Sequence, residues 1–326
     1  MDMLYLLAGT KMSRRDNTIY IKPKEGKARR FPVETLKHIV VAGASQFNSE
    51  LVSFLGKQGV RLSFLDYYGH FSASLESANL HASGAVHLAQ AKTILDLENR
   101  LALGKLIMGA GLQNIIGNLR YYTYRGKSTL KPAIEEIKVQ RQALLEKAQD
   151  VDEMMGHEGQ ARQIYYSAWK LINPPLKITK RTRRPPKDRI NSLISFCNGL
   201  VYSICKNELS KTHLDLTLSF VHAPTQARAS LSLDLAEIFK PIITDKLIFG
   251  LINRDMMEDK DFEETEGMCL LSEHGRRKVV DGFREKMDRE EVGDLRGWRA
   301  VILREAFKIQ AHVLGMENYV PYVHKV

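Results

Sequence analysis

Cysteine is scarce in this sequence of 326 residues, which contains Cys197, Cys205 and Cys269 and no Cys-x-x-Cys pair. An odd number of thiols without such a pair does not indicate a disulfide framework. Cys197 and Cys205 fall in one expected helix, where eight residues of rise separate them by about 12 Å, too far for a disulfide. We therefore expect structural thiols in a reducing compartment, and hence a cytoplasmic protein.

Long apolar runs are also missing. The longest uncharged run near the middle, residues 190–205, contains Asn and Ser and is too short to span a membrane. The N-terminus lacks a basic leader followed by a long apolar core, so no signal peptide is expected. The sequence contains no internal repeat and no low-complexity tract. These absences argue against a membrane protein.

The sequence has fewer acidic than basic residues. It contains 38 Asp and Glu and 48 Lys and Arg, which gives a formal net charge of +10. Such a charge favours a polyanionic partner, either nucleic acid or an anionic membrane surface. The hydrophobic fraction of 44% and the charged fraction of 26% are ordinary for a globular protein. The length indicates two domains.

The sequence pattern changes near residue 85. Before it, short β-branched, aromatic and leucine-rich runs predict strands, one helix interrupts them, and Asp16-Asn17 is a hairpin turn. The predicted strands are residues 4–7, 18–21, 38–41, 60–64 and 71–75, and the helix is 46–57. Helical spacing then predicts helices over 86–122, 132–154, 154–172, 191–208, 241–253 and 298–314. We predict an α+β protein with a β-rich, sandwich-like domain (1–85) and a larger all-α catalytic domain (90–326).

Residues 220–241 contain the first candidate site. His222 lies in a segment that a nearby proline favours as a loop, and Ser230 can cap the helix that follows. Asp234 and Glu237 are three residues apart and therefore share one face of that helix. A loop histidine and two carboxylates can bind a divalent metal. The alternative is a solvated helix face beside a hydrogen-bonded loop histidine.

A second stretch, residues 154–172, places an acid on an apolar stripe. Ala161, Tyr165 and Trp169 follow helical spacing, and Glu158 lies on the same inward-facing stripe. An acid in that position requires a cation, and Gly159 leaves room for another helix or a phosphate. The alternative is that Glu158 caps the N-terminus of this helix and interacts with its dipole.

The third stretch, residues 177–191, holds seven basic residues and one acid. Most charge runs are solvated loops, but this one lies between two helices of a basic protein, which favours phosphate contact. No aromatic residue is interleaved, so base stacking is not indicated. The predicted DNA-binding residues are Lys180, Arg181, Arg183, Arg184, Lys187, Arg189 and Asn191.

Taken together, these stretches resemble the CRISPR-associated endonuclease and integrase family of the adaptation step, the Cas-one family. Glu158, Gly159, Ala161 and Tyr165 match a Glu-Gly-x-Ala-x-x-x-Tyr helix, and residues 184–191 match Arg-Pro-Pro-x-Asp-x-x-Asn. Phe220 and His222 match a Phe-x-His motif. An Arg-x-Ser-Leu-x-x-Asp-Leu-x-Glu motif follows it and is matched by Arg228, Ser230, Leu231, Asp234, Leu235 and Glu237. The resemblance covers essentially the whole chain.

The resemblance implies catalysis by a metal bound to Glu158, His222 and Glu237, with Asp234 assisting or holding a second metal. Such a site suits Mn²⁺ or Mg²⁺, and its histidine favours Mn²⁺. Without metal, the converging carboxylates would repel and raise each other's pKa.

The resemblance also implies a metal-dependent endonuclease and integrase that inserts foreign DNA fragments into a CRISPR array. Its implied partners are double-stranded DNA, a second copy of the chain joined through the β-rich domain, and a small ferredoxin-like CRISPR protein. Two alternatives stay open. One is a non-catalytic nucleic-acid-binding scaffold with structural acids. The other is a hydrolase of small phosphate esters, against which the net charge argues.

Overall fold

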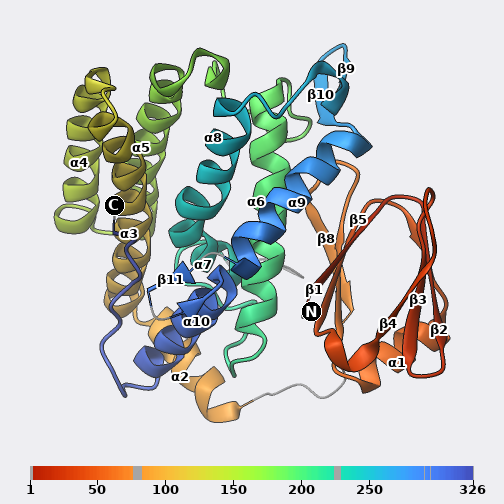
Figure 1. Cartoon of the computed structure of the whole chain (residues 1–326). Coiled ribbons are helices and arrows are strands. Elements are labelled where there is room, and N and C mark those ends of the chain that lie inside the picture. The colour runs from red at the N-terminus through yellow and green to blue at the C-terminus, as the bar shows by residue number, and fades with distance from the viewer. Residues whose placement is uncertain (1–2, 76–82, 224–228, 290, 294, 326) are drawn as a thin grey trace. The chain divides into compact units, whose positions relative to one another are not determined.

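The computed structural model describes residues 3–75, 83–223, 229–289, 291–293 and 295–325. The chain divides into two compact units. Unit 1 comprises Met1–Leu80, Thr182–Ser203 and Met257–Gly282, and unit 2 comprises His81–Arg181, Ile204–Met256 and Phe283–Val326. A strand-rich first part followed by a predominantly helical part confirms the predicted fold class (Figure 1).

The strand-rich part of unit 1 consists of two four-stranded sheets, ordered β1-β5-β7-β8 and β4-β3-β2-β6. In the first sheet β1, β5 and β7 run parallel, and β8 is antiparallel to β7. The elements are β1 (Met3–Leu7), β2 (Thr10–Arg15), β3 (Thr18–Lys22), β4 (Arg29–Pro32), β5 (His38–Ala42), β6 (Ser45–Gln46), α1 (Ser49–Lys57), β7 (Arg61–Leu65) and β8 (Phe71–Leu75). Strands β2 and β6 were not predicted.

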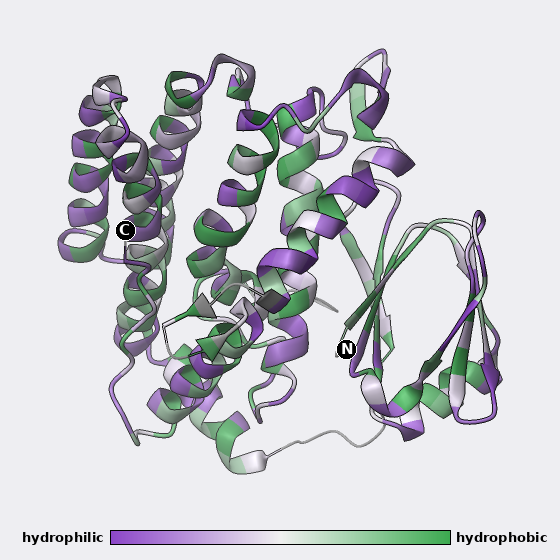
Figure 2. Ribbon diagram, viewed as in Figure 1, coloured by the Kyte–Doolittle hydropathy of each residue, from purple (hydrophilic) through white to green (hydrophobic). Residues whose placement is uncertain are grey.

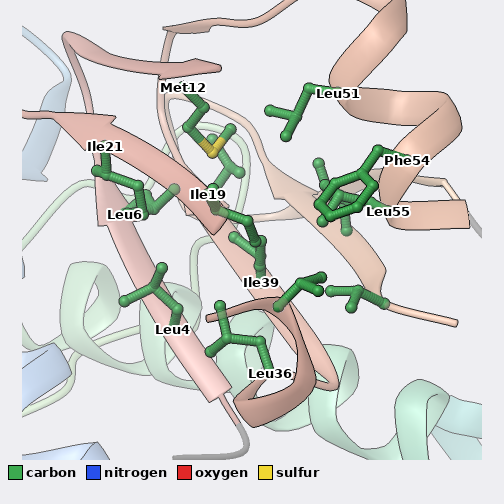
Figure 3. Packing of buried hydrophobic residues seen from close by; sticks show 14 residues of the cluster. Leu4, Leu6, Met12, Ile19, Ile21, Leu36, Ile39, Leu51, Phe54 and Leu55 are labelled. Atoms are coloured by element: carbon green, nitrogen blue, oxygen red, sulfur yellow. The ribbon is translucent and has the colours of Figure 1, made fainter. Parts of the chain in front are cut away.

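A single apolar core lies between these sheets and under α1. Figure 3 shows Leu4 and Leu6 of β1 facing Ile19 and Ile21 of β3, with Leu51 of α1 at one side. Alternation on β3 buries its two isoleucines while the other side chains are more exposed, as expected for a strand with one solvated face. This packing of two sheets agrees with the sandwich-like form expected for the first part.

The remainder of the chain is predominantly helical. Its helices are α2 (Gly84–Leu95), α3 (Leu97–Tyr124), α4 (Lys131–Glu146), α5 (Val151–Ile172), α6 (Arg189–Leu209), α7 (Leu231–Lys240), α8 (Lys246–Asn253), α9 (Glu273–Arg289) and α10 (Trp298–Val313). Two short hairpins, β9 (Phe262–Thr265) with β10 (Met268–Leu271) and β11 (Glu291–Val292) with β12 (Leu295–Arg296), interrupt them. The hairpins and α9 were not predicted.

Two predicted helix boundaries are wrong for the same reason. The expected helix 86–122 is divided at Asp96, whose carboxylate accepts a hydrogen bond from the amide of Asn99 at 3.1 Å and so begins α3. The expected helix 132–154 ends at Glu146, and Asp150 caps α5 through the amide of Glu153 at 2.8 Å. In both places an aspartate starts a new helix within a continuous apolar pattern.

Helix α3 is central to unit 2, where it packs against α4, α5 and α7. Figure 2 shows hydrophobic residues on the inner sides of α4 and α5 and hydrophilic residues on their outer sides. None of the described helices is long and apolar enough to cross a membrane. The three cysteines are buried and free, as predicted.

Candidate metal centre

Helix α5 carries Glu158 well inside the helix. The N-cap is Asp150, two turns earlier, so the alternative that Glu158 caps this helix is wrong. Glu158 is buried on the stripe that also buries Ala161 and Tyr165, as its spacing predicted. A buried carboxylate on this stripe must have a positively charged or hydrogen-bonding partner.

Helix α7 is buried along its whole length, including Asp234, Glu237 and Lys240. These residues recur every third position and therefore lie along one face. The alternative of a solvated helix face is wrong, because Asp234 is 0% exposed and Glu237 is 5% exposed. Helix α3 fixes this helix closely, since a Cβ added at Gly111 would lie 2.8 Å from the carbonyl oxygen of Glu237.

Asp234 holds the loop that carries His222. One of its oxygens accepts hydrogen bonds from the amides of Phe220 and Val221 at 2.7 and 3.0 Å. The other accepts from the amide of His222 at 3.0 Å and lies 2.7 Å from its Nδ1. Arg100 fixes the same loop from outside by donating to the carbonyl of Phe220 at 2.9 Å. Asp234 thus has the geometry of an anchor for the histidine.

The ring orientation of His222 follows from that anchor. A carboxylate can only accept, so Nδ1 carries the hydrogen and Nε2 of the neutral ring keeps its lone pair. Nε2 lies 3.9 Å from Oε1 of Glu237, and the side chain of His222 is 25% exposed. The structure therefore brings His222 and Glu237 together with a ring nitrogen able to bind a cation.

Ser230 takes the N-cap position of α7, but its side chain does not cap the helix. Its hydroxyl donates instead to the carbonyl of Thr217 at 2.9 Å and accepts from Ser219 at 2.7 Å. The capping role predicted for Ser230 is therefore wrong. Arg228, which belongs to the same motif, lies outside the described residues.

Two cationic side chains neutralise the acids of this centre. Arg162 donates from Nε to Glu158 and from Nη2 to Glu237, so one guanidinium bridges α5 and α7. Lys240 donates to the second oxygen of Glu237 at 2.5 Å. Glu158, Glu237 and His222, which are distant in sequence, thus converge within unit 2.

The pKa of Glu237 reflects these neighbours. Burial on its own would raise it, but the charges of Lys240 and Arg162, together with that of His222 when its ring is protonated, outweigh burial and lower this pKa to about 2. Burial would likewise lower the pKa of Arg162, but Glu158 and Glu237 raise it well above its usual value. The expected mutual repulsion of the carboxylates is wrong, because both acids are paired with cations.

The side chains of Glu158, His222 and Glu237 are of the types that bind divalent cations, but their present arrangement would not hold one. Among the residues that the structure describes, no group of three or more His, Cys, Asp or Glu side chains is set to hold a metal ion. The guanidinium of Arg162 lies between Glu158 and Glu237 and serves as a stand-in cation. Two carboxylates around one cation, with an imidazole nitrogen beside them, form a donor set suited to Mn²⁺ or Mg²⁺.

A further buried acid, Asp245, was not predicted. It is the last residue of a π-helical segment, Pro241–Asp245, where the predicted helix 241–253 is irregular. Tyr165 donates to its carboxylate at 3.0 Å, and Asn118 donates to the tyrosine oxygen at 3.0 Å. Burial raises the pKa of Asp245 to about 7, although Arg162, Tyr165, Lys240 and Arg181 act against it.

The basic run is divided between the two units. Lys180 and Arg181 belong to unit 2, whereas the residues from Thr182 onward belong to unit 1. Arg183, Arg184 and Lys187 are exposed, as a phosphate-binding role requires.

The other two predicted DNA-binding residues have structural partners. Arg189 forms ion pairs with Asp259 at 2.7 Å and Glu264 at 2.5 Å, so its charge is largely neutralised. Asn191 is fully buried, and its side chain binds Asp188 and the amide of Thr182. Asp188 in turn accepts from the amide of Asn191 at 2.8 Å, which begins α6. This part of the Arg-Pro-Pro motif thus fixes a helix start.

Comparisons with known proteins agree over most of the chain. The family model described as CRISPR associated protein Cas1 matches residues 4–285. A CRISPR-associated endonuclease Cas1 from Clostridium perfringens is 34% identical over 325 residues, which cover 97% of each protein. A CAS1 protein from Thermotoga maritima has 29% identity and a TM-score of 0.86, with 98% of this chain and 100% of that chain covered. A casposase bound to integration product shares the fold, with a TM-score of 0.84 and 21% identity over 98% of this chain and 92% of that one.

Proposed function

The chain belongs to the CRISPR-associated protein Cas1 family, and we propose that it is a metal-dependent DNA endonuclease and integrase that inserts DNA fragments into a CRISPR array. One observation carries the proposal. Glu158, His222 and Glu237 come from two helices and a loop of unit 2, where Arg162 bridges the two acids and Nε2 of His222 lies 3.9 Å from Glu237. A relative named as an endonuclease, 34% identical over nearly the whole length, supports the same activity.

The arrangement of His222 favours this function over a scaffold with structural acids. A structural acid needs only its cation, and Arg162 and Lys240 already supply that. The buried Asp234 additionally fixes the ring so that Nε2 faces Glu237. Such a carboxylate–histidine arrangement is typical of metal ligands, because it sets the tautomer and the orientation of the ring.

We propose that Glu158, Nε2 of His222 and Glu237 hold a divalent metal, with the imidazole favouring Mn²⁺ over Mg²⁺. When bound, such a metal stabilises the charge that develops on the phosphoryl group and promotes deprotonation of the attacking oxygen. The chain's own residues orient the site. Asp234 holds the proton on Nδ1, and both its oxygens are engaged by the 220–222 loop. Its role is therefore positioning rather than binding a second metal.

Double-stranded DNA is the proposed substrate, held in part by the exposed basic side chains of Arg183, Arg184 and Lys187. These residues are exposed and positively charged, so they can bind backbone phosphates irrespective of sequence. Lys180 and Arg181 extend the same run, whereas Arg189 and Asn191 stabilise the protein around it.

We further propose that residues 1–85 form the dimerisation domain and residues 90–326 the catalytic domain. Two copies would join through the β-rich domain and bind a small ferredoxin-like CRISPR adaptation protein. The three free, buried thiols fit the cytoplasmic location expected for such a complex. Light scattering of the intact chain at micromolar concentration should give a dimeric mass, and a monomeric mass would contradict this assembly.

The catalytic assignment is tested with Glu158→Gln, His222→Ala and Glu237→Gln. Each should abolish Mn²⁺-dependent duplex cleavage and strand joining, because each removes one ligand. Lys170→Gln is the matched control, since Lys170 is exposed on the same helix as Glu158 and should keep full activity. Circular dichroism would show that the variants are folded. Folded variants that still cleave DNA would show that these three residues are not the catalytic ligands, whereas a wild-type chain that binds duplex DNA without cleaving it in Mn²⁺ would support the scaffold alternative.

A further inference from the structure

The guanidinium of Arg162 lies between Glu158 and Glu237, in the position that a metal bound to both carboxylates would take. Its Nε hydrogen bond goes to Glu158, one turn earlier on α5, and its Nη2 hydrogen bond goes to Glu237 on α7. Since Lys240 engages the other oxygen, both oxygens of Glu237 already accept from a cation. Arg162 thus joins α5 to α7, whereas the pair of Lys240 and Glu237 lies within α7.

A guanidinium in this position and a shared metal ion exclude each other. Arginine stays charged at any pH at which the protein is folded, so it cannot make room by losing a proton. Its side chain is only 14% exposed, which limits screening by water. A divalent ion bound to the same oxygens would face a like charge a few ångströms away in a poorly solvated site. The guanidinium must therefore leave at least one carboxylate.

We infer that Arg162 is an internal competitor of the metal, which joins Glu158 to Glu237 in the metal-free protein and is displaced when the metal binds. This inference rests on the proposed metal site. The competition has two consequences. The metal-free centre keeps its shape because the acids remain bridged, and the apparent affinity for metal is lower than the ligands alone would give.

The opposite reading is a fixed brace, in which Arg162 keeps both acids oriented while the metal binds beside it. Removing a brace would disorder the ligands and weaken metal binding. Removing a competitor would strengthen it. The sign of the change in affinity therefore separates the two roles.

The experiment measures Mn²⁺ affinity of the full-length chain by the electron paramagnetic resonance signal of free Mn²⁺, together with the melting temperature in EDTA. Arg162→Gln should bind Mn²⁺ about tenfold or more tightly than the wild type, the equivalent of one lost charge-assisted hydrogen bond. It should also melt at a lower temperature in EDTA. Lys170→Gln removes an exposed charge from the same helix and should change the affinity by less than about twofold.

Arg162→Lys covers the case in which Arg162→Gln does not fold. A lysine keeps the charge but lacks the planar fork that engages two acids at once, so Mn²⁺ should bind more tightly than to the wild type. Unchanged or weaker binding in both variants would overturn the inference.

Glu237→Gln distinguishes that failure from failure of the proposed site. If Glu237→Gln abolishes Mn²⁺ binding and the Arg162 variants do not tighten it, the site stands and the competitor role is wrong. If Glu237→Gln binds Mn²⁺ like the wild type, the metal lies elsewhere and both proposals are wrong.

Discussion

Replacing Asp234 with asparagine should release the His222 loop and impair both folding and activity. The carboxylate accepts from the amides of residues 220, 221 and 222 and from Nδ1 of His222, at 2.7 to 3.0 Å. An asparagine side chain replaces one accepting oxygen with an NH₂ group, whose hydrogens would face N–H donors. At least one buried donor then loses its acceptor, at about 1–3 kcal/mol each, and the charge assistance of the other bonds is lost.

The expected loss of stability for Asp234→Asn is about 3–5 kcal/mol, the range for removing one partner of a buried charged network. For folding units of 150–250 residues, each kcal/mol lowers the melting temperature by about 2–4 °C, so we expect a shift of about 6–20 °C. Below that temperature, metal affinity or activity should fall by about 10- to 100-fold, because His222 is no longer oriented. Differential scanning calorimetry and Mn²⁺-dependent cleavage would measure the two effects.

Asp215→Asn is the matched control for this variant. Asp215 also accepts from a backbone amide and a hydroxyl, both of Thr217, but at an exposed position. Its replacement should cost less than about 1 kcal/mol, because water can substitute for the lost acceptor. If Asp234→Asn melts as close to the wild type as Asp215→Asn does, Asp234 does not anchor the His222 loop.

Three further predictions concern other parts of the molecule. Burial raises the pKa of Asp245 to about 7, so the folded state binds this proton more tightly than the unfolded state. The free energy of unfolding should therefore decline as the pH rises from about 4 to about 7. In urea titrations, Asp245→Asn should remove up to about 4 kcal/mol of that decline, and a pH profile equal to that of the wild type would count against a protonated Asp245. Gly111→Ala should lower stability by about 1–3 kcal/mol and impair cleavage, because its methyl group would meet the backbone at Glu237. Gly104→Ala should be milder, because its methyl group would come nearest to the flexible Met154 side chain, with Val221 at an ordinary contact distance of 3.5 Å; equal melting temperatures would contradict this. Changing Arg183, Arg184 and Lys187 to Gln should flatten the plot of the logarithm of the duplex-binding constant against the logarithm of the salt concentration, whose slope should fall by up to about 0.9 per lost phosphate contact. Changing the exposed control residues Lys131, Lys147 and Lys170 to Gln should leave that slope unchanged.

Strands were predictable where one face of the strand is strongly apolar. Ile19 and Ile21 alternate with polar residues on β3, and the prediction there was confirmed. Strand β2 has a single large apolar residue, Met12, among charged neighbours, so its period-2 signal is too weak to detect. It forms because β3 supplies partners for its backbone, which is a tertiary effect. Helix divisions at Asp96 and Asp150 were missed because an N-cap within a continuous apolar pattern does not change the period.

The candidate site was predictable only in its local parts. Spacing placed Asp234 and Glu237 on one face and Glu158 on a buried stripe, as the structure shows. The path of the 220–222 loop, which makes Asp234 an anchor, depends on tertiary hydrogen bonds and has no sequence period. Asp245 and Asn118 are 127 positions apart by their numbers in the chain, and only the fold brings both to Tyr165. Asn118 nevertheless left a readable signal, because it is a polar residue within the apolar helix α3.

The charge balance of the centre could have been inferred from the sequence. Arg162 follows Glu158 by four positions and Lys240 follows Glu237 by three, which are the spacings at which helical side chains pair. On a solvated surface such pairs contribute little, which makes them easy to disregard. On buried faces these pairs decide whether the carboxylates repel each other. Two carboxylates paired with two cations leave the metal-free centre without the repulsion that the acids alone would produce. A divalent ion added to this neutralised set would introduce excess positive charge in a poorly solvated site. Because displacement of Arg162 removes that excess, we expect the metal to bind as Arg162 leaves.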